Sequence, residues 1–377
     1  MPASLRRFGK TEQYVSPFSL GTMRLVNCPE SVAHDTVVSA VERGINHIET
    51  AQAYGISEIR LGTILSQDLS SVRDRLTITT KLVPTLPPTK LREALERSLD
   101  RLQLDYIDNF AFHGINLPEH LELVLNGGLQ TIQEAVAEGL VKHIGFSTHG
   151  SLELIQTAIA TKAFEFVNLH YYYFNQRNQT AIALAAQQDM GVFVISPADK
   201  GGMLYQPPQT LADLCQPFSP LEFGYRFLLD TPAIHTLSLG AAQPSDLDAA
   251  FSALEPSADW LESKQAIDLR LQDMLANRLE SDRCSQCYQC LPCPEAINIP
   301  EMLRLRNLEA GLGMTEFAQY RYNMFEKAGH WFPGRKGDRC TECGDCLPRC
   351  PEYLDIPRLL ADAHDRLNVR TIRRLWE

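Results

Sequence analysis

The feature that most constrains the fold is a regular alternation of short apolar runs and amphipathic stretches over residues 1 to about 278. Such runs, bounded by turn residues, are typical of buried strands, and the stretches between them are typical of helices. The expected strands are Ser19–Met23, His47–Ala51, Leu76–Lys81, Tyr106–His113, His143–Ser147, Phe166–Tyr171, Val192–Ser196 and Thr236–Leu239. The clearest expected helices are Lys90–Leu102, Leu129–Glu138 and Gln179–Gln188. Eight alternations favour an α/β fold of the (β/α)8 barrel type. A doubly wound sheet is the alternative, but no G-x-G-x-x-G follows the first run.

A second feature is the clustering of eight of the ten cysteines between Cys284 and Cys350. They form two sets, each with three cysteines separated by two residues and a fourth that precedes a proline. The sets are Cys284, Cys287, Cys290 and Cys293, then Cys340, Cys343, Cys346 and Cys350. Similar segments, INIPEMLRLRN and LDIPRLLADAH, follow the two sets, so this part of the chain is an internal repeat of a turn and a helix. In a reducing compartment, dense and regular cysteines indicate metal or cluster binding rather than disulfides.

The spacing of these cysteines favours two [4Fe–4S] clusters over zinc. Three thiolates in C-x2-C-x2-C bind one cubane, and the cysteine before proline binds the neighbouring cluster in two-cluster ferredoxins. This pattern groups Cys284, Cys287 and Cys290 with Cys350, and Cys340, Cys343 and Cys346 with Cys293. The first set has two residues before its fourth cysteine where the common pattern has three. Two structural zinc sites are the alternative, although zinc usually takes its thiolates as two separated C-x2-C pairs.

Composition predicts two domains and excludes several classes of partner. We expect the barrel to span residues 1–278 and a smaller, mainly helical, ferredoxin-like domain with the two clusters to span 279–377. The net charge of −11 and the pI near 5.4 argue against nucleic-acid and anionic-membrane partners. No apolar run reaches membrane-spanning length, and the N-terminus lacks a secretory signal, so we expect a cytoplasmic protein.

Four candidate catalytic residues lie near the ends of three successive expected strands. Glu49 stands near the end of the second strand, Tyr54 follows on the loop, Lys81 closes the third strand and His113 closes the fourth. Barrel enzymes place catalytic groups at these C-terminal ends. A tyrosine phenol can donate a proton to a reacting oxygen, and Tyr54 is the candidate donor. We expect Lys81 to lower the pKa of Tyr54 from its ordinary value of about 10, Glu49 to hold Lys81 by ion pairing, and His113 to orient the substrate or assist protonation.

These residues, in this order, resemble the catalytic tetrad of the aldo-keto reductase family, and the resemblance covers most of residues 1–255. It extends to the segments RRFGKTEQYVSPFSLGTMRL, GFSTHG, VNLHYYY, VISPADKGGML and SLGAAQPSDL. With the cysteine repeat, the chain is similar to the branch of the family that carries a C-terminal two-[4Fe–4S] ferredoxin-type domain. The resemblance implies NAD or NADP as the cofactor and a small carbonyl or alcohol as the substrate.

The resemblance also implies which residues bind the nicotinamide cofactor. They are Met23, Arg24, Ser147, Thr148, Asn168, Ser196, Lys200, Gly201, Gly202 and Gly240. The chain departs from the family pattern at four places. These are Glu49 for Asp, Thr148 for Asn, Asn168 for Gln, and Ile195 for a stacking Tyr. Asp246 and Asp248 follow the last strand, where acidic residues would repel a 2′-phosphate, so strict use of NADPH is not expected.

The expected function is an NAD(P)H-linked oxidoreductase of the aldo-keto reductase type. The two clusters would relay single electrons between the barrel and an outside redox protein such as a ferredoxin. The alternative is a nicotinamide-sensing regulatory barrel with little turnover, whose clusters are structural or sense oxidation. The departures at Glu49, Thr148 and Asn168 are compatible with that alternative.

Overall fold

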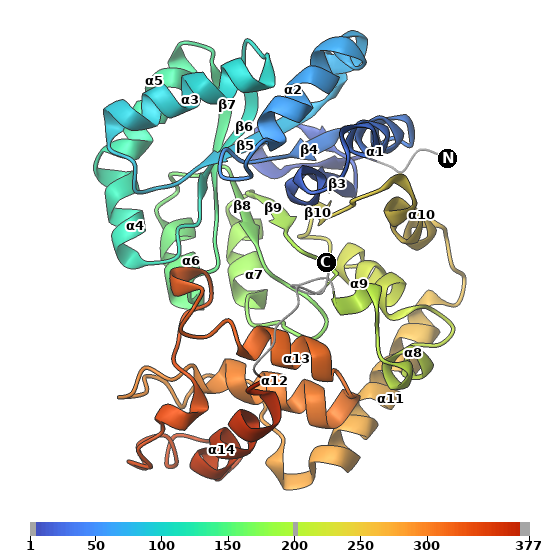
Figure 1. The fold of residues 1–377 in the computed structure, drawn as a ribbon, viewed down its shortest axis with the longest axis vertical. Helices are drawn as coiled ribbons and strands as arrows, with labels where there is room; N and C mark the ends of the chain where they lie inside the picture. Colours follow the sequence, from blue (N-terminus) through green and yellow to red (C-terminus); the bar gives the residue numbers. More distant parts are fainter. Residues whose placement is uncertain (1–4, 199–202, 370–377) are drawn as a thin grey trace. The chain divides into compact units, whose positions relative to one another are not determined.

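The structure is a computed structural model that describes residues 5–198 and 203–369 (Figure 1). Its contacts divide the chain into two compact units. The first unit is Met1–Pro197 with Gly224–Glu255, and the second is Ala198–Phe223 with Pro256–Glu377. The helix α11, Trp260–Leu279, packs on other helices of the second unit, although the expected domain boundary at 278/279 grouped it with the barrel.

Eight parallel strands close into a barrel in sequence order, with the last strand against the first. The strands are β3 Phe18–Gly21, β4 His47–Glu49, β5 Thr77–Leu82, β6 Ile107–His113, β7 Val141–Ser147, β8 Phe166–Leu169, β9 Gly191–Val194 and β10 Thr236–Leu239. Each expected apolar run overlaps one of them, so the predicted (β/α)8 barrel is confirmed. The C-terminal ends of all eight strands therefore meet at one rim of the barrel, where catalytic groups of such barrels lie.

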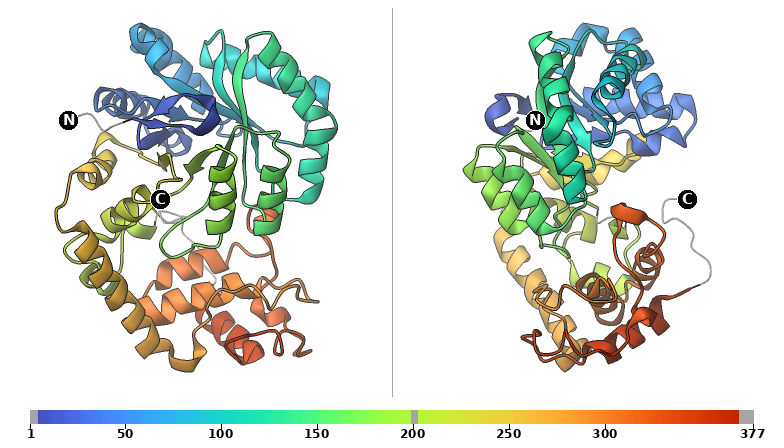
Figure 2. Two further views of the ribbon diagram at one scale, coloured as in Figure 1. Left: turned by 180° about the vertical axis from the view of Figure 1, so that it is seen from behind. Right: turned by 90° about the vertical axis from the view of Figure 1, so that its left-hand side faces the viewer.

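Helices lie on the outside of these strands (Figures 1 and 2). They are α1 Glu30–Glu42, α2 Ser57–Gln67, α3 Pro88–Leu102, α4 Pro118–Leu123, α5 Leu129–Ala137, α6 Leu152–Ala160, α7 Gln179–Gln187, α9 Pro220–Leu229 and α10 Asp248–Leu254. In α3, Leu91, Leu95 and Leu99 are buried at a spacing of four residues, while Lys90 and Glu93 are exposed. This amphipathic spacing explains why the stretch forms a helix against the barrel.

A hairpin, β1 Arg6–Arg7 with β2 Tyr14–Val15, closes the barrel interior at the N-terminal ends of the strands. Phe8 follows β1 and is fully buried in one cluster with Phe166 and Phe193. A Cβ atom at Gly191 would lie 2.7 Å from the Phe8 ring, so only glycine fits beside it. With this end filled by side chains, the opposite rim is the end that is available to a ligand.

The second unit is mainly helical, as the sequence predicts. Its longer helices are α8 Gln209–Leu214, α11, α12 Ile299–Leu312, α13 Thr315–Tyr322 and α14 Ile356–Leu367. The central helix α12 packs against α11, α13 and α14. The repeat is visible at two helix starts, because Asn298 accepts a hydrogen bond from the Glu301 N–H and Asp355 accepts one from the Arg358 N–H. Such caps satisfy backbone donors in the first turn of a helix.

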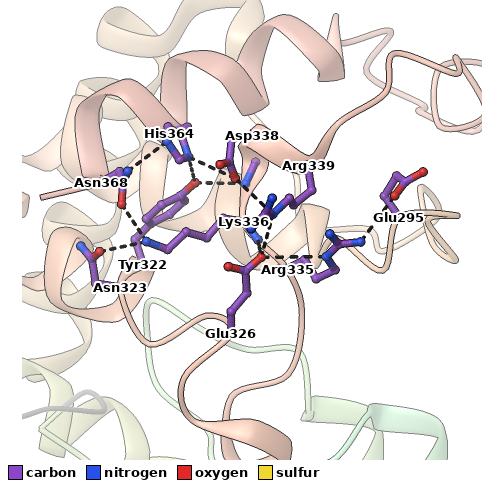
Figure 3. A network of polar contacts seen from close by, with 11 residues as sticks. Glu295, Tyr322, Asn323, Glu326, Arg335, Lys336, Asp338, Arg339, His364 and Asn368 are labelled. Atoms are coloured by element: carbon purple, nitrogen blue, oxygen red, sulfur yellow. Dashed lines mark hydrogen bonds and ion pairs between the residues drawn. The ribbon is translucent and has the colours of Figure 1, made fainter. Parts of the chain in front are cut away.

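A polar network fixes the segment that leads into the second cysteine set (Figure 3). The Gly337 N–H donates to the Tyr322 hydroxyl oxygen at 3.0 Å, and that oxygen lies 2.8 Å from Nδ1 of His364. Lys336 Nζ donates to Asn323 at 3.1 Å and to Asn368 at 2.7 Å. The network therefore holds the residues before Cys340 between α13 and the C-terminal end of α14.

Within residues 5–198 and 203–369, no helix has both the length and the apolar character that a membrane crossing requires.

Candidate active site and cluster-binding pockets

The four candidate catalytic residues come together at the C-terminal rim of the barrel. Glu49 and His113 end β4 and β6, Lys81 lies in β5, and Tyr54 lies between β4 and α2. Lys81 Nζ forms an ion pair with Glu49 Oε1 and donates to the Thr50 carbonyl oxygen at 2.6 Å. The same Nζ lies 4.9 Å from the centroid of the Tyr54 ring, and the Tyr54 and His113 rings meet edge to face at 5.6 Å. Strand order alone thus gathers groups that are far apart in the sequence.

The ion pair of Glu49 and Lys81 is almost completely buried. Their side chains are 5% and 2% exposed, respectively. Burial lowers the pKa of Lys81, and the adjacent carboxylate of Glu49 opposes that shift. Burial and the charge of Lys81 lower the pKa of His113 to about 3. His113 is therefore a neutral imidazole near neutral pH, and it can donate a hydrogen bond without carrying charge.

Tyr54 behaves differently from the sequence expectation. Burial raises the pKa of its phenol above the ordinary value, so the expected lowering by Lys81 is wrong for this structure. The reason is geometric, because Lys81 Nζ lies over the ring of Tyr54 and donates to Glu49 and Thr50. Tyr54 therefore keeps its proton across the physiological pH range, which is the form that a proton donor needs.

A glycine on the neighbouring strand lies beside the carboxylate of Glu49. Gly21 of β3 is the register partner of Glu49 in β4. A Cβ atom at Gly21 would lie 2.5 Å from the hydroxyl oxygen of Ser238, so a larger residue there would have to displace that hydroxyl. The same Cβ atom would lie 3.5 Å from Glu49 Oε2, which is ordinary van der Waals contact.

Two expected cofactor residues lie directly beside this group. Ser147 is the register partner of His113 across β6 and β7, and Asn168 is the register partner of Ser147 across β7 and β8. Asn168 is fully buried, and within the described residues neither Oδ1 nor Nδ2 of its amide has a hydrogen-bond partner. A buried amide left in this state is costly unless a ligand completes it. An external carboxamide matches both atoms, so the site fits a nicotinamide.

Thr148 has hydrogen bonds that tie it to the backbone. Its hydroxyl donates to the Ile115 carbonyl oxygen at 2.7 Å and accepts from the Gly150 N–H at 3.0 Å. The one proton of the hydroxyl is therefore used inside the protein. Thr148 braces the loop after β7, and only its remaining lone pair is available to a cofactor.

Arg24 and Gly240, both expected to contact the cofactor, lie together because β10 neighbours β3. Arg24 Nη1 donates to the Gly240 carbonyl oxygen at 2.7 Å and lies 3.5 Å from Asp246 Oδ2. Asp246 also accepts a hydrogen bond from the Ala242 N–H at 2.9 Å. The guanidinium of Arg24, from the turn after β3, thus lies against the loop after β10, which suits an anionic part of a cofactor.

The remaining expected cofactor residues are less informative. Met23 lies in a single 3-10 turn after β3 and is 50% exposed. Ser196 is exposed after β9 and has a left-handed φ of 54°. Lys200, Gly201 and Gly202 lie outside the described residues.

The eight clustered cysteines line two pockets of the second unit. Each pocket has three cysteines from one set and the fourth cysteine of the other set. The first pocket contains Cys284, Cys287, Cys290 and Cys350. The second contains Cys340, Cys343, Cys346 and Cys293. The structure thus brings the cysteines together in the groups that their spacing predicts.

The surroundings of these cysteines favour a strongly bound cationic group. Apolar side chains from the starts of α12 and α14 also line the pockets, among them Leu303 and Leu360. Burial raises the pKa of the Cys290 thiol to about 12, and it also raises the pKa values of Cys284 and Cys346. Thiolates there need iron or another metal to compensate their charge. Each thiolate of a cubane binds a different iron, and in the described part of the chain no three His, Cys, Asp or Glu side chains gather as one metal ion requires.

One residue that the sequence reasoning missed lies against a cluster cysteine. Gln286 Nε2 is 3.3 Å from the sulfur of Cys284 and donates to the Pro300 carbonyl oxygen at 3.0 Å. The position between two cysteines of C-x2-C carries no residue signature of its own. Aligning the two halves of the repeat would have been the signal, because Gln286 then corresponds to Glu342.

Comparison with known families gives two matches in agreement with these sites. Residues 17–255 match the Aldo/keto reductase family. Residues 283–354 match the 4Fe-4S dicluster domain. The matches cover the barrel and the cysteine repeat, respectively.

Individual relatives match over shorter spans. The chain is 30% identical over 161 residues to a 6-dehydroglucose reductase of Novosphingobium aromaticivorans, which covers 38% of this chain and 51% of the relative. It is 33% identical over 132 residues to the methylglyoxal reductase DkgB of Escherichia coli O157:H7, covering 35% and 47%. The chain thus spans about half the length of these curated relatives. A solved aldo-keto reductase from Bacillus halodurans in its holo form superposes with a TM-score of 0.62 at 21% identity, covering 71% of this chain and 96% of that chain. That likeness shows the fold of the barrel.

Proposed function

Because this chain belongs to the Aldo/keto reductase family, we propose that its barrel catalyses the NAD(P)H-linked reduction of a small carbonyl compound, or the reverse oxidation of the alcohol. The observation that carries the proposal is the convergence of Tyr54, Lys81, His113 and Glu49 at the C-terminal rim. Its most similar curated relatives include reductases named for 6-dehydroglucose and methylglyoxal. These two compounds are therefore the first substrates to test.

In this proposal Tyr54 holds the proton that the substrate oxygen receives. Its raised pKa keeps the phenol protonated until negative charge develops on that oxygen. The ammonium of Lys81, held by Glu49, lies 4.9 Å from the centroid of the Tyr54 ring, and its positive charge at the rim favours the developing alkoxide. Neutral His113, edge to face with Tyr54, donates a hydrogen bond that orients the carbonyl. Together these groups would let the carbonyl carbon receive a hydride while the carbonyl oxygen receives a proton.

A bound nicotinamide would supply the hydride. The unsatisfied amide of Asn168 and the hydroxyl of Ser147 would hold its carboxamide beside His113. Arg24 and the backbone near Gly240 would contact its phosphates. Asp246 already pairs with Arg24 and Asp248 with Arg43, so neither carboxylate is an isolated charge. Both NADH and NADPH are therefore proper candidates.

The proposal is tested by replacing Tyr54 with Phe and following carbonyl-dependent oxidation of NADH and NADPH by the anaerobically purified protein. We expect kcat to fall by roughly 100-fold or more, since general acid catalysis contributes about that much. Tyr14→Phe is the matched control, because Tyr14 is an exposed phenol on β2. Equal turnover by the wild type and Tyr54→Phe across aldehydes and quinones would contradict the catalytic proposal. It would favour the nicotinamide-sensing barrel.

We further propose that the cysteine pockets bind two [4Fe–4S] clusters that carry single electrons to or from an outside redox protein such as a ferredoxin. A hydride carries two electrons, whereas each cluster accepts one. A flavin or a substrate that tolerates an unpaired electron must therefore convert between them. Addition of NADH or NADPH should bleach the broad visible band of the clusters when a flavin or such a substrate is present. A band that persists would leave the clusters structural or oxidation-sensing. The reducing cytoplasm is the compartment that suits such thiolate-bound clusters.

A further inference from the structure

The two cysteine pockets differ at one position that the internal repeat makes equivalent. Gln286 lies two residues after Cys284, and Glu342 lies two residues after Cys340. Both adopt the left-handed backbone conformation, with φ of 62° and 55°. The backbone is thus alike in the two halves, and the side chain is an amide in one and a carboxylate in the other.

The amide of Gln286 is directed at the sulfur of Cys284. Nε2 donates one proton to that sulfur at 3.3 Å and the other to the Pro300 carbonyl oxygen at 3.0 Å. If the amide of Gln286 were flipped, its oxygen would face the sulfur of Cys284 and the carbonyl oxygen of Pro300. Both are hydrogen-bond acceptors, so the orientation with Nε2 toward them is correct. Oε1 is buried and has no hydrogen-bond partner among the described residues. The side chain therefore keeps its contact with sulfur at a cost to its own carbonyl group.

Glu342, the equivalent residue in the other cysteine set, cannot make this contact. Its side chain is exposed, and an ionised carboxylate has no proton to donate. Reduction of an iron–sulfur cluster adds one negative charge, which spreads over its sulfur atoms. A donor to sulfur stabilises the reduced form and raises the reduction potential, and a nearby carboxylate does the reverse.

We propose that Gln286 makes the cluster of Cys284, Cys287, Cys290 and Cys350 the higher-potential member of the pair. This inference rests on the proposal that the chain binds two [4Fe–4S] clusters. An electron that enters at the cluster of Cys340 then moves to the cluster of Cys284, so that the first is reoxidised and the second reduced. One electron moves, and no proton is required. Electron flow through the repeat thus has a direction that is set by one residue.

The test is an anaerobic potentiometric titration of the full-length holoprotein, followed by visible absorption and electron paramagnetic resonance. We expect two midpoint potentials in the wild type. Gln286→Leu should lower only the higher one, and it should shift the equilibrium between the clusters about tenfold, equivalent to about 59 mV for one electron. Glu342→Gln should raise only the lower one. Gln289→Leu is the matched control, because Gln289 is an exposed amide of the same loop, and it should leave both potentials unchanged.

Iron and sulfide analysis of each variant separates the two possible failures. A wild-type chain that binds no iron–sulfur cluster after anaerobic reconstitution would overturn the cluster proposal itself. Variants that retain both clusters while Gln286→Leu moves the lower potential, or moves neither, would overturn the role of Gln286 alone. If Gln286→Leu fails to retain both clusters, the Glu342→Gln variant is used in its place. A Glu342→Gln protein in which the higher potential shifts, or in which neither potential shifts, would contradict the inference.

Discussion

The barrel site and the cysteine pockets are formed by chain folding in different ways. In the barrel, β4, β5 and β6 deliver Glu49, Lys81 and His113 to one rim, and the ion pair between Glu49 and Lys81 is already formed. In the second unit, tandem cysteines from two halves of a repeat cross over to line two pockets. Burial there raises the pKa values of Cys284, Cys290 and Cys346.

This difference shows where each site obtains its electrostatic stability. The charges of the barrel site compensate each other within the protein, so the site is organised before any ligand binds. In the pockets, burial raises the pKa values of Cys284, Cys290 and Cys346, so their thiolates depend on a metal group for compensating positive charge. Mutations should therefore damage the barrel site through unpaired charge and the pockets through loss of a ligand.

The largest expected effect comes from the crossed cysteines. Cys350→Ser should remove the cluster of Cys284, Cys287 and Cys290, and Cys293→Ser should remove the cluster of Cys340, Cys343 and Cys346. Each variant should retain about half of the iron, because each cubane needs its fourth thiolate. Iron analysis with electron paramagnetic resonance checks this result. Cys28→Ser is the control, since Cys28 hydrogen-bonds to the Leu25 carbonyl oxygen in the barrel. Loss of the same cluster in both variants would contradict the crossed grouping.

The next effect concerns the buried ion pair. Lys81→Met leaves the carboxylate of Glu49 buried without its partner, which should cost about 3 kcal/mol of barrel stability. The double variant Lys81→Met with Glu49→Gln should regain most of that stability but no activity. Hydrogen exchange of the barrel strands and turnover assays measure the two quantities separately.

The control for that pair is Lys90→Met. Lys90 pairs with Glu93 on the exposed face of α3, so its loss should cost less than about 1 kcal/mol. A Lys81→Met protein as stable as Lys90→Met would show that the pair is not the electrostatic centre of the barrel site.

A smaller effect is expected at the unsatisfied amides. Asn168→Leu should raise the dissociation constant of the nicotinamide cofactor about tenfold, because it removes both partners of the carboxamide. Asn168→Leu should leave the apo barrel equally stable or more stable, because the substitution removes a buried amide that has no hydrogen-bond partner among the described residues. Asn109→Leu is the matched control, because Asn109 in β6 is equally buried and equally unsatisfied but lies farther from the rim. Cofactor titrations that respond equally to the two variants would exclude Asn168 as a specific contact.

The smallest effect is a pH dependence of barrel stability. Burial and the charge of Lys81 lower the pKa values of both His47 and His113 to about 3. Between about pH 6.5 and pH 3 the unfolded chain binds these protons and the folded barrel does not, so stability is lost as pH falls. Lowering the pH from 7 to 6 should cost about 0.7 kcal/mol for each histidine.

Hydrogen exchange of amides in β4 and β6, corrected for intrinsic rates, measures that change. His47→Gln should reduce that change, because it removes one buried histidine whose pKa is lowered. A barrel that gains stability on acidification over this interval would contradict the neutral state of the two rings.

Much of the fold could be predicted because the barrel strands are short runs of apolar and β-branched residues that alternate with amphipathic stretches. His47–Ala51 and Leu76–Lys81 overlap β4 and β5 closely, and the order of strand ends fixes which polar residues share the rim. The three tandem cysteines of each pocket could also be predicted, because their spacing is local, and the pattern of two-cluster ferredoxins supplied the crossed fourth cysteine. The grouping of α11 with the second unit could not be predicted from the sequence, because it depends on packing between segments that are distant in sequence.

Details of the sites depended on distances that a sequence does not contain. The raised pKa of Tyr54 follows from a Lys81 Nζ that lies over the ring and donates elsewhere, and no motif encodes that position. Gly21 lies beside Glu49 on the neighbouring strand, which only the register reveals. The contact of Gln286 with Cys284 likewise required side-chain geometry.

The most direct test of the whole account is an anaerobic measurement of the visible spectrum and of carbonyl-dependent NAD(P)H oxidation in the same sample. Wild type, Tyr54→Phe and Cys350→Ser would be compared. The account predicts a broad brown band and turnover in the wild type, the full band without turnover in Tyr54→Phe, and about half the band in Cys350→Ser. A wild type without the band, or a Tyr54→Phe protein that turns over as fast as the wild type, would contradict it.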